Sequence, residues 1–426
     1  MNIKAIERVN VAEYMTQLGK HAKLVSSNLA RLSSADKNQA LESIAQSIER
    51  QSDHILRENS RDMVAAEQND LTPALKDRLY LDESRIQSTV LGCRQVANLP
   101  DPVGEMTETI QRPSGLQIRQ MRVPLGVVGI IYESRPNVTV DAAVLCFKSG
   151  NACILRGGSE AFYSNMALAS CIRQGLMDAG LSEYCIQFVE TTDRAAVDCL
   201  ITMDEDIDII VPRGGKGLIQ RISQHATVPV IKHLDGICHV YIDNEADIQK
   251  AIRVAYNAKA RRYGICGAME TLLVAEEIAP KILPELSSLY RDKGIQIRAC
   301  QRSRQFIDGS VPASEQDWTT EYLDAILSVR IVDDLDEAIS HIETYGSGHT
   351  DAIITENLTS QNEFMRRVDS SSVMINTSTQ FADGFEYGLG AEIGISTDKL
   401  HVRGPVGLEG LTCQKYIVIS DGLARD

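Results

Sequence analysis

The 426-residue sequence lacks any stretch close to the roughly 20 consecutive apolar residues that a membrane-spanning helix needs. Its first residues carry scattered charges and no apolar block, which argues against a secretory signal peptide. It also lacks a long run of Lys and Arg, and 43 basic against 58 acidic residues give a net charge of −15. Because such a chain repels phosphate backbones and anionic lipids, we expect no binding to nucleic acid or to a membrane surface.

The ten cysteines form neither a CxxC pair nor a Cys/His cluster with the spacing of a zinc site. No His, Asp or Glu cluster has ligand spacing either, so no metal site is predicted. Most cysteines spread singly through a large chain are small buried apolar residues. This pattern favours free thiols and the cytosol. Composition alone does not say whether one of them is a nucleophile.

The chain has no internal repeat and no low-complexity linker, and its hydrophobic patterns indicate helices first and then an α/β alternation. The first hundred residues are predicted to be helical, with N-caps at Ser34, Thr72 and Asp82. Residues 107–111 and 115–123 alternate around a turn, which indicates a hairpin with polar faces. The strands predicted beyond it are 125–132, 152–155, 186–189, 206–211, 228–231, 239–242, 271–275, 351–354, 372–375 and 413–419. The helices predicted between them lie near 138–148, 159–178, 194–203, 216–224, 245–257 and 359–369, and this alternation is typical of a parallel sheet covered on both faces.

Two glycine-rich turns each follow a predicted strand and precede a predicted helix: Arg156-Gly157-Gly158-Ser159-Glu160 and Pro212-Arg213-Gly214-Gly215-Lys216-Gly217. The free N–H groups and the positive end of the helix at such a turn suit a phosphate or a ribose. Neither turn matches GxxxxGK[ST] or GxGxxG, so an ordinary turn stays an alternative for each. Because open α/β sheets bind ligands at the carboxyl ends of their strands, two such turns favour a ligand site more than one does.

Two other segments carry candidate catalytic groups. Asn137 follows an apolar strand, and it either caps the next helix or offers an amide that stabilises an oxyanion. Cys266 lies in a glycine-flanked segment between elements, where a thiolate is accessible, and Lys259, Arg261 and Arg262 are near enough in sequence to lower its pKa. A structural thiol is the alternative for Cys266. The segments around His349 and Asp235 are interpreted as turns first.

Several long blocks resemble the gamma-glutamyl phosphate reductases of the aldehyde dehydrogenase superfamily. These blocks are VPLGVVGIIYESRPNVTVDAAVLCFKSGNACILRGGSEA, MDEDIDIIVPRGGKGLI, HLDGICHVYID, DDLDEAISHIETYGSGHTDAI and GLGAEIGISTDKLH. The resemblance implies an α/β fold with a Rossmann-like cofactor domain, an α/β catalytic domain and a small β flap for oligomerisation. It places an NADPH-binding domain at 1–106 and 124–243, a catalytic domain at 244–385, the flap at 107–123 and 408–426, and a connecting segment at 386–407.

The resemblance also implies NADPH-dependent reduction of L-glutamyl 5-phosphate to L-glutamate 5-semialdehyde in proline biosynthesis. The implied protein is a cytoplasmic homo-oligomer with functional coupling to glutamate 5-kinase. Cys266 falls on the family's nucleophile and Asn137 on its oxyanion hole. The superfamily's cofactor motif falls on Arg156, Gly157, Ser159 and Glu160 and its ribose-contacting Glu on Glu321, while the second glycine-rich turn adds Gly214, Gly215 and Lys216. Arg135 and His349 are assigned to the substrate's carboxylate or phosphate.

The sequence departs from the superfamily at three positions. Asp235 stands where hydrolytic members carry the Glu that activates water, and a reductase acting on an acyl phosphate needs no water attack. Tyr263 and Gly267 stand where many relatives have Pro and Asn. We therefore expect the loop around the Cys266 thiol to differ in its local geometry from that of those relatives. An oxidative aldehyde dehydrogenase and a catalytically silent nucleotide-binding protein remain the alternative functions.

Overall fold

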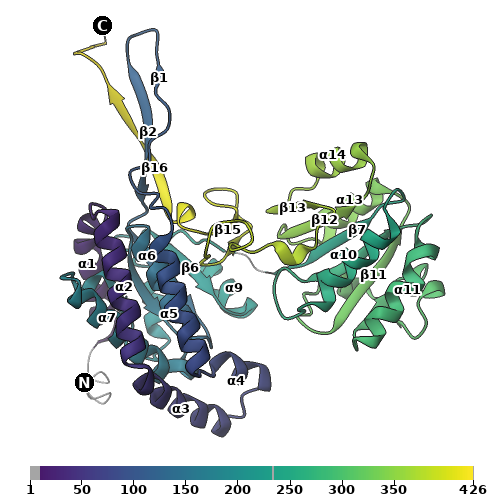
Figure 1. Ribbon diagram of the computed structural model, residues 1–426, viewed down its shortest axis with the longest axis horizontal. Coiled ribbons are helices and arrows are strands. Elements are labelled where there is room, and N and C mark those ends of the chain that lie inside the picture. Colours follow the sequence, from purple (N-terminus) through teal and green to yellow (C-terminus); the bar gives the residue numbers. More distant parts are fainter. Residues whose placement is uncertain (1–9, 233–234, 426) are drawn as a thin grey trace. The chain divides into compact units, whose positions relative to one another are not determined.

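The computed structural model describes residues 10–232 and 235–425. The chain divides into two compact units (Figure 1). The first unit contains the described residues up to Lys232, the short segment Leu389–Gly394 and the chain from Val406 onward. The second unit contains the described residues from Asp235 to Gly388 and the segment Ile395–Pro405.

The first unit is built on a four-stranded parallel sheet in the order β5-β4-β3-β6. Its strands are nearly all buried, as their mostly apolar sequences predict: β3 (Val127–Tyr132), β4 (Ala152–Arg156), β5 (Ile186–Phe188) and β6 (Ile209–Arg213). Helices and 3-10 turns surround this sheet (Figure 1): α1 (Val11–Leu29), α2 (Ser34–Arg50), α3 (Ser52–Gln68), α4 (Pro73–Leu79), α5 (Glu83–Asn98), α6 (Pro136–Lys148), η2 (Ser159–Ala161), α7 (Phe162–Asp178), η3 (Glu183–Cys185), α8 (Ala195–Leu200) and α9 (Lys216–His225).

The N-cap predictions for the early helices are confirmed at two of three positions. Thr72 accepts the N–H of Leu75, and Asp82 accepts the N–H of Arg85. The prediction for Ser34 is wrong by one residue, because Ser33 caps α2 in a reciprocal capping box with Asp36. Two adjacent serines offer the same hydroxyl, and the position of Asp36 three residues after Ser33 decides between them.

A three-stranded antiparallel sheet extends away from the first unit (Figure 1). The predicted hairpin forms β1 (Ile110–Gln111) and β2 (Gln117–Pro124), and the isolated C-terminal strand is β16 (Thr412–Ile419), which follows the 3-10 turn η6 (Glu409–Leu411). β16 pairs with β2 along its whole length, from Thr412 opposite Pro124 to Ile419 opposite Gln117. The flap is therefore assembled from segments that are almost three hundred residues apart in the chain.

The second unit is built on a seven-stranded parallel sheet in the order β10-β9-β11-β8-β7-β12-β13. These strands are β7 (Cys238–Ile242), β8 (Met269–Ala275), β9 (Gln296–Ala299), β10 (Val311–Pro312), β11 (Ile326–Val332), β12 (Thr350–Ile354) and β13 (Ser372–Ile375). A continuous apolar core lies between this sheet and its helices. The other elements are α10 (Ile248–Ala260), α11 (Ala279–Asp292), η4 (Ser303–Phe306), α12 (Glu315–Trp318), α13 (Leu335–Tyr345), α14 (Leu358–Arg367), η5 (Thr379–Phe381) and the two-stranded pair β14 (Ile395–Ser396) and β15 (Gly404–Pro405).

Three predictions about the organisation of the chain need correction. Residues 228–231 form no strand, because Val230 makes only an isolated bridge to Ile210. β7 was placed in the first domain but lies between β8 and β12 in the second sheet, so the first unit's main segment ends at Lys232 rather than at residue 243. The predicted connecting segment 386–407 is shared between the two units. An apolar strand carries no local signal that tells which of two sheets it joins, which explains the misplaced boundary.

Among the described residues, no helix combines the length and the apolar composition that crossing a membrane requires.

Candidate active site

The loop that carries Cys266 runs from α10 to β8 in the second unit. Cys266 is partly exposed, whereas six of the ten free cysteines are buried. The backbone of Gly236 lies directly against it, since a Cβ at Gly236 would lie 2.3 Å from the carbonyl oxygen and 2.8 Å from the Cα of Cys266. The Cys238 thiol also donates a hydrogen bond to the Cys266 carbonyl, with 3.1 Å between Sγ and O. The segment that precedes β7 therefore fixes the backbone of the accessible thiol.

We expect Gly236→Ala to lower the rate of any reaction that uses the Cys266 thiol about a hundredfold, while the protein stays folded. The added Cβ cannot be accommodated within 2.3 Å of a backbone oxygen, so the Cys266 loop must shift. A misplacement of about 1 Å at a reacting atom costs about that factor. Steady-state kinetics and circular dichroism would measure the two effects. Gly264→Ala is the matched control in the same loop, because a Cβ there meets only the Leu323 oxygen at 3.9 Å. Equal losses in the two variants would contradict the role of Gly236.

Glu321 and His349 both lie in the surroundings of this loop. Glu321 Oε1 accepts the N–H of Gly236 at 2.9 Å. His349 is fully buried, and its Nδ1 lies 3.6 Å from Cys238 Sγ and 2.9 Å from Thr350 Oγ1. The structure thus connects both residues to Cys266 through the segment that positions it.

A buried ion pair frames the same loop. Lys259 Nζ at the end of α10 lies 2.5 Å from Glu270 Oε2 at the start of β8, and the two side chains are 0% and 1% exposed. The other Glu270 oxygen accepts the N–H of Leu323 at 3.1 Å, and Leu323 has a φ of +51°. Burial raises the pKa of Glu270 to about 7 and lowers the pKa of Lys259, and the attraction between the two charges opposes both shifts. Lys259 was expected to act on the thiol, but its ammonium contacts Glu270. Glu270 was not among the predicted site residues, although a Glu inside an apolar strand is itself a signal.

In the first unit, the turn after β4 places Arg156 against its own backbone. The Arg156 guanidinium donates to the carbonyls of Gly157, at 2.6 Å, and Thr192, at 3.1 Å. Its Nε is buried and has no hydrogen-bond partner among the described residues. Gly157 allows close packing here, because a Cβ would lie 2.2 Å from Asn165 Nδ2 and would force that side chain to shift. The turn therefore brings a buried cation and close-packed backbone to the carboxyl end of the sheet.

Two residues that the sequence analysis missed lie between the glycine-rich turns. Ser134, with a φ of +44°, donates its N–H and its hydroxyl to Glu160 Oε1, each at 2.6 Å. Glu133 Oε2 accepts the N–H of Gly215 at 2.8 Å, one residue before the exposed Lys216 that begins α9. β3 lies between β4 and β6, so the loop at its end reaches both turns. The sequence did contain a signal for these two residues, since they are a pair of polar residues directly after an apolar strand.

Asn137 lies in the first turn of α6 and is exposed. The alternative that it caps this helix is wrong, because Arg135 occupies the N-cap position and Pro136 is the first helical residue. Asn137 Nδ2 donates to Asp141 Oδ2 at 2.9 Å, one turn further along. The carboxylate thus holds one of the two amide hydrogens and orients the other, as an oxyanion donor requires.

Asp141 gives this segment a pH dependence that can be measured. Burial raises its pKa from 3.8 to about 6, against the opposing effects of Asn137 and Arg213. The folded state therefore binds more protons than the unfolded state between about pH 4 and pH 6, and the free energy of unfolding falls as the pH rises through this window. Asp141→Asn carries no such proton, so its stability relative to wild type should rise across the same window. Urea unfolding at several pH values would test this, and parallel stability curves for the two proteins would contradict it.

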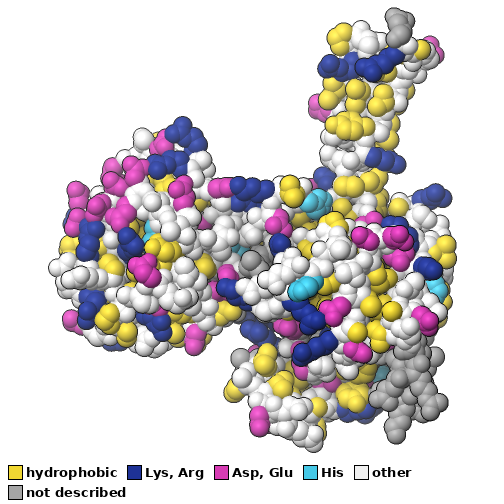
Figure 2. Space-filling view, turned by 180° about the vertical axis from the view of Figure 1, so that it is seen from behind, with side chains coloured by type: hydrophobic (Ala, Val, Ile, Leu, Met, Phe, Trp, Pro, Cys, Tyr) yellow, Lys and Arg dark blue, Asp and Glu magenta, His cyan; other side chains and the backbone are white. Residues whose placement is uncertain are grey.

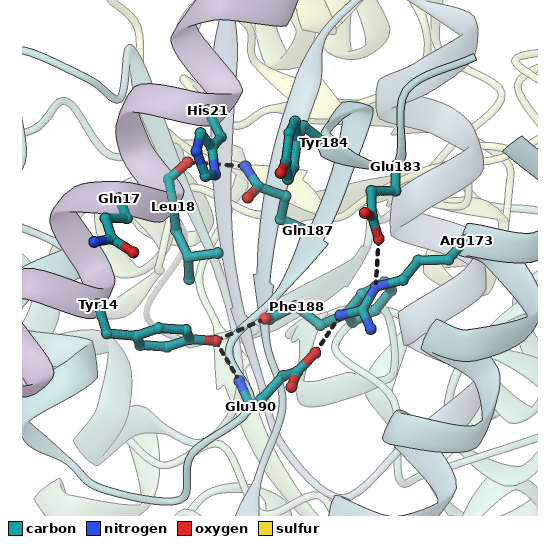
Figure 3. A pocket seen from close by; sticks show the side chains of 10 residues that line it. All are labelled: Tyr14, Gln17, Leu18, His21, Arg173, Glu183, Tyr184, Gln187, Phe188 and Glu190. Carbon is teal, nitrogen blue, oxygen red and sulfur yellow. Dashed lines mark hydrogen bonds and ion pairs between the residues drawn. The ribbon is translucent and has the colours of Figure 1, made fainter. Parts of the chain in front are cut away.

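A surface cavity of about 240 Å³ lies between α1, α7 and β5 in the first unit (Figure 3). Its charged groups already pair with one another, since Arg173 contacts Glu183 at 3.8 Å and also binds Glu190. The Tyr14 hydroxyl donates to the Phe188 carbonyl at 3.2 Å and accepts the N–H of Glu190 at 2.9 Å. These contacts attach α1 to the edge strand β5, and we interpret the cavity as part of that packing rather than as a ligand site.

The family model described as the aldehyde dehydrogenase family matches residues 3–296 of the sequence. This match covers more than half of the chain, and the chain belongs to the aldehyde dehydrogenase family. The parallel sheets of the two units agree with the aldehyde dehydrogenase fold that the sequence blocks implied, and that prediction is confirmed.

Among the solved structures that are similar to this chain, two are gamma-glutamyl phosphate reductases. The gamma-glutamyl phosphate reductase from Thermotoga maritima is 42% identical, with a TM-score of 0.95 over 97% of this chain and 100% of that chain. A second gamma-glutamyl phosphate reductase, from Saccharomyces cerevisiae, is 30% identical, with a TM-score of 0.54 over 97% and 98%. A glyceraldehyde-3-phosphate dehydrogenase from Methanocaldococcus jannaschii, solved in complex with NADP, is 15% identical with a TM-score of 0.69 over 96% and 95%, which shows the fold alone. The resemblance to the gamma-glutamyl phosphate reductases is confirmed.

Proposed function

We propose that the protein is an NADPH-dependent reductase that converts L-glutamyl 5-phosphate to L-glutamate 5-semialdehyde and phosphate, in proline biosynthesis. The observation that carries the proposal is the full-length similarity, at 42% identity, to a gamma-glutamyl phosphate reductase. The partly exposed Cys266, held by Gly236 and Cys238, supplies the nucleophile that this reaction needs. Asp235 in place of a water-activating Glu favours reduction over hydrolysis to an acid.

The covalent chemistry takes place at Cys266. Its thiolate attacks the acyl carbon of the substrate, a C–S bond forms, and the oxyanion is stabilised by the Asn137 amide and the Cys266 backbone N–H. The oxyanion then collapses, the C–O bond to the phosphate breaks, and the phosphate leaves with that electron pair. A thioester to Cys266 remains. After hydride addition, the thiohemiacetal releases the aldehyde and restores the thiolate.

The cofactor of this reaction is NADPH, which supplies the hydride when bound. The residues proposed to hold it are Arg156, Gly157, Ser159, Glu160, Gly214, Gly215, Lys216 and Glu321. Two features of the first unit suit the binding of NADPH. Arg156 presents a buried Nε that lacks a hydrogen-bond partner among the described residues, and the start of α9 presents N–H groups beside glycines. Glu321 would act from the second unit, where it holds Gly236 beside the nucleophile.

In this proposal, the two units have different roles. The first unit binds NADPH and the second carries the nucleophile. Arg135, at the start of α6, is proposed to attract the negative charge of the substrate. His349 is also proposed to serve the substrate end, and its full burial means that it would act through Cys238 and Thr350. The ten free cysteines support a reducing compartment, and we propose the cytoplasm.

The flap is proposed to pair subunits into a homo-oligomer. Figure 2 shows hydrophobic side chains on the surface of the projecting sheet. The large apolar residues that the flap exposes are Ile110, Tyr416, Val418 and Ile419. A three-stranded sheet with apolar residues in water is an unfavourable surface unless another chain covers it. Functional coupling to glutamate 5-kinase is proposed as well, because an acyl phosphate hydrolyses readily when it is free in water.

A reverse assay tests the proposed function. The protein is incubated with glutamate 5-semialdehyde and NADP or NAD, with and without inorganic phosphate. We expect reduction of the cofactor that depends on phosphate and is faster with NADP. Phosphate-independent formation of glutamate would instead identify an oxidative aldehyde dehydrogenase. Labelling with iodoacetamide tests the remaining alternative, since a Cys266 no more reactive than the other nine thiols would favour a silent binding protein.

A further inference from the structure

The start of α9 carries a negative charge from the chain itself. Glu133 Oε2 accepts the N–H of Gly215, the N-cap residue of α9, at 2.8 Å. The first N–H groups of a helix and its dipole attract anions, which is why phosphates bind at such positions. One carboxylate oxygen of Glu133 therefore accepts a backbone N–H at the kind of helix start that binds phosphate oxygens in other proteins.

We propose that Glu133 is an internal anion that occupies the diphosphate position at the start of α9 until the cofactor displaces it. The inference rests on the proposed function, which assigns the turn of Gly214, Gly215 and Lys216 to NADPH. Gly214 agrees with this role, because a Cβ there would lie 2.6 Å from the same carboxylate oxygen. The carboxylate of Glu133 thus fills the space that a side chain at position 214 would need.

The carboxylate of Glu133 is able to leave this position. Glu133 is exposed, so water solvates its charge as soon as the side chain turns away from the helix. Exposed charged contacts of this kind contribute little to stability. A diphosphate brings charge of the same sign, and it competes for the same N–H group. Binding of NADPH therefore requires that Glu133 be displaced, and the charge of Glu133 weakens the binding.

The two roles that Glu133 could have predict opposite results. If its carboxylate only braced the turn, loss of its charge would leave the affinity for NADPH unchanged or reduce it. If the carboxylate competes with the diphosphate, loss of its charge increases the affinity. The increase also depends on salt, because the repulsion between exposed charges is screened as the ionic strength rises.

The experiment is a titration of the purified full-length protein with NADPH, followed by the fluorescence of the nucleotide. Glu133→Gln keeps the shape of the side chain and a carbonyl oxygen that can accept the Gly215 N–H, but it removes the charge. We expect the Kd of this variant to be about two- to fivefold lower than that of wild type at low salt, as for the loss of one exposed charge interaction. The ratio of the two Kd values should approach one at high salt.

Glu337→Gln is the matched control, because Glu337 also accepts a backbone N–H at a helix start, from Asp333 at 2.7 Å, in the second unit. Its Kd should equal that of wild type. Equal or weaker binding by Glu133→Gln, or a gain that does not change with salt, overturns the proposal. A wild-type protein that binds no NADPH would overturn the cofactor assignment itself, which distinguishes the two failures.

Discussion

Cys266→Ala is expected to lower the rate of glutamyl phosphate reduction by about 10⁴-fold or more, because the alanine cannot form the thioester. The change removes one sulfur from a loop whose backbone is held by Gly236 and by the Cys238 thiol, so the fold should be unchanged. The variant should also bind NADPH with the affinity of wild type, since the glycine-rich turns lie in the first unit. The fall of NADPH absorbance measures the rate, and nucleotide fluorescence measures the binding.

Cys199→Ala provides the matched control for Cys266→Ala. Cys199 is also partly exposed, but it lies on α8 in the first unit. Its loss should leave the rate close to that of wild type. If Cys266→Ala kept a large part of the activity, or if Cys199→Ala lost as much, Cys266 would not be the nucleophile and the proposed thioester route would have to be abandoned.

Lys259→Met is expected to destabilise the protein by about 3–5 kcal/mol, because it leaves the Glu270 carboxyl buried without its cation. The two side chains are 0% and 1% exposed, and they lie 2.5 Å apart. Urea unfolding followed by circular dichroism measures the loss. Because the pair joins α10 to β8 on either side of the Cys266 loop, the rate should fall along with the stability.

The double variant Lys259→Met with Glu270→Leu separates the two possible causes of that loss. Replacing both partners by apolar residues removes the uncompensated charge, so most of the stability should return. A double variant as unstable as Lys259→Met alone would show that the loss comes from packing of the lysine stem rather than from the buried charge.

Much of the fold is predictable from local patterns, and the errors have a common physical cause. Mostly apolar runs identify β3, β4, β8 and β12, because strands buried on both faces need no polar alternation. The elements α11, β9, β11 and α13 were not predicted. β9 carries exposed and half-buried residues between its buried ones, which weakens the apolar signal. β7 was predicted as a strand but assigned to the wrong unit, because which sheet a strand joins depends on residues far away in the chain.

In the candidate site, too, residues in local motifs are predictable from the sequence, whereas contacts between distant segments are not. Cys266 is identifiable as the cysteine between glycines, and the turns at Arg156 and Gly214 are identifiable as strand–glycine–helix junctions. The contact of Gly236 with Cys266 is not identifiable, since it joins segments thirty residues apart. The same holds for Glu133 and Gly215, which lie 82 residues apart and meet only because β3 and β6 are neighbours in the sheet. Sequence patterns therefore find reactive groups more readily than the residues that position them.

The pairing of β16 with β2 has a consequence for the order in which the chain can fold during synthesis. The first unit needs the segment from Val406 onward, whereas most of the second unit is one continuous stretch. A ribosome would thus release the complete second sheet while β2 still lacks its neighbour. Until β16 emerges, the backbone groups of β2 that face it remain an open edge, which is the kind of surface that pairs with the wrong chain. Errors in the assembly of this protein should therefore concentrate at the flap, in the interval between the synthesis of β2 and that of β16.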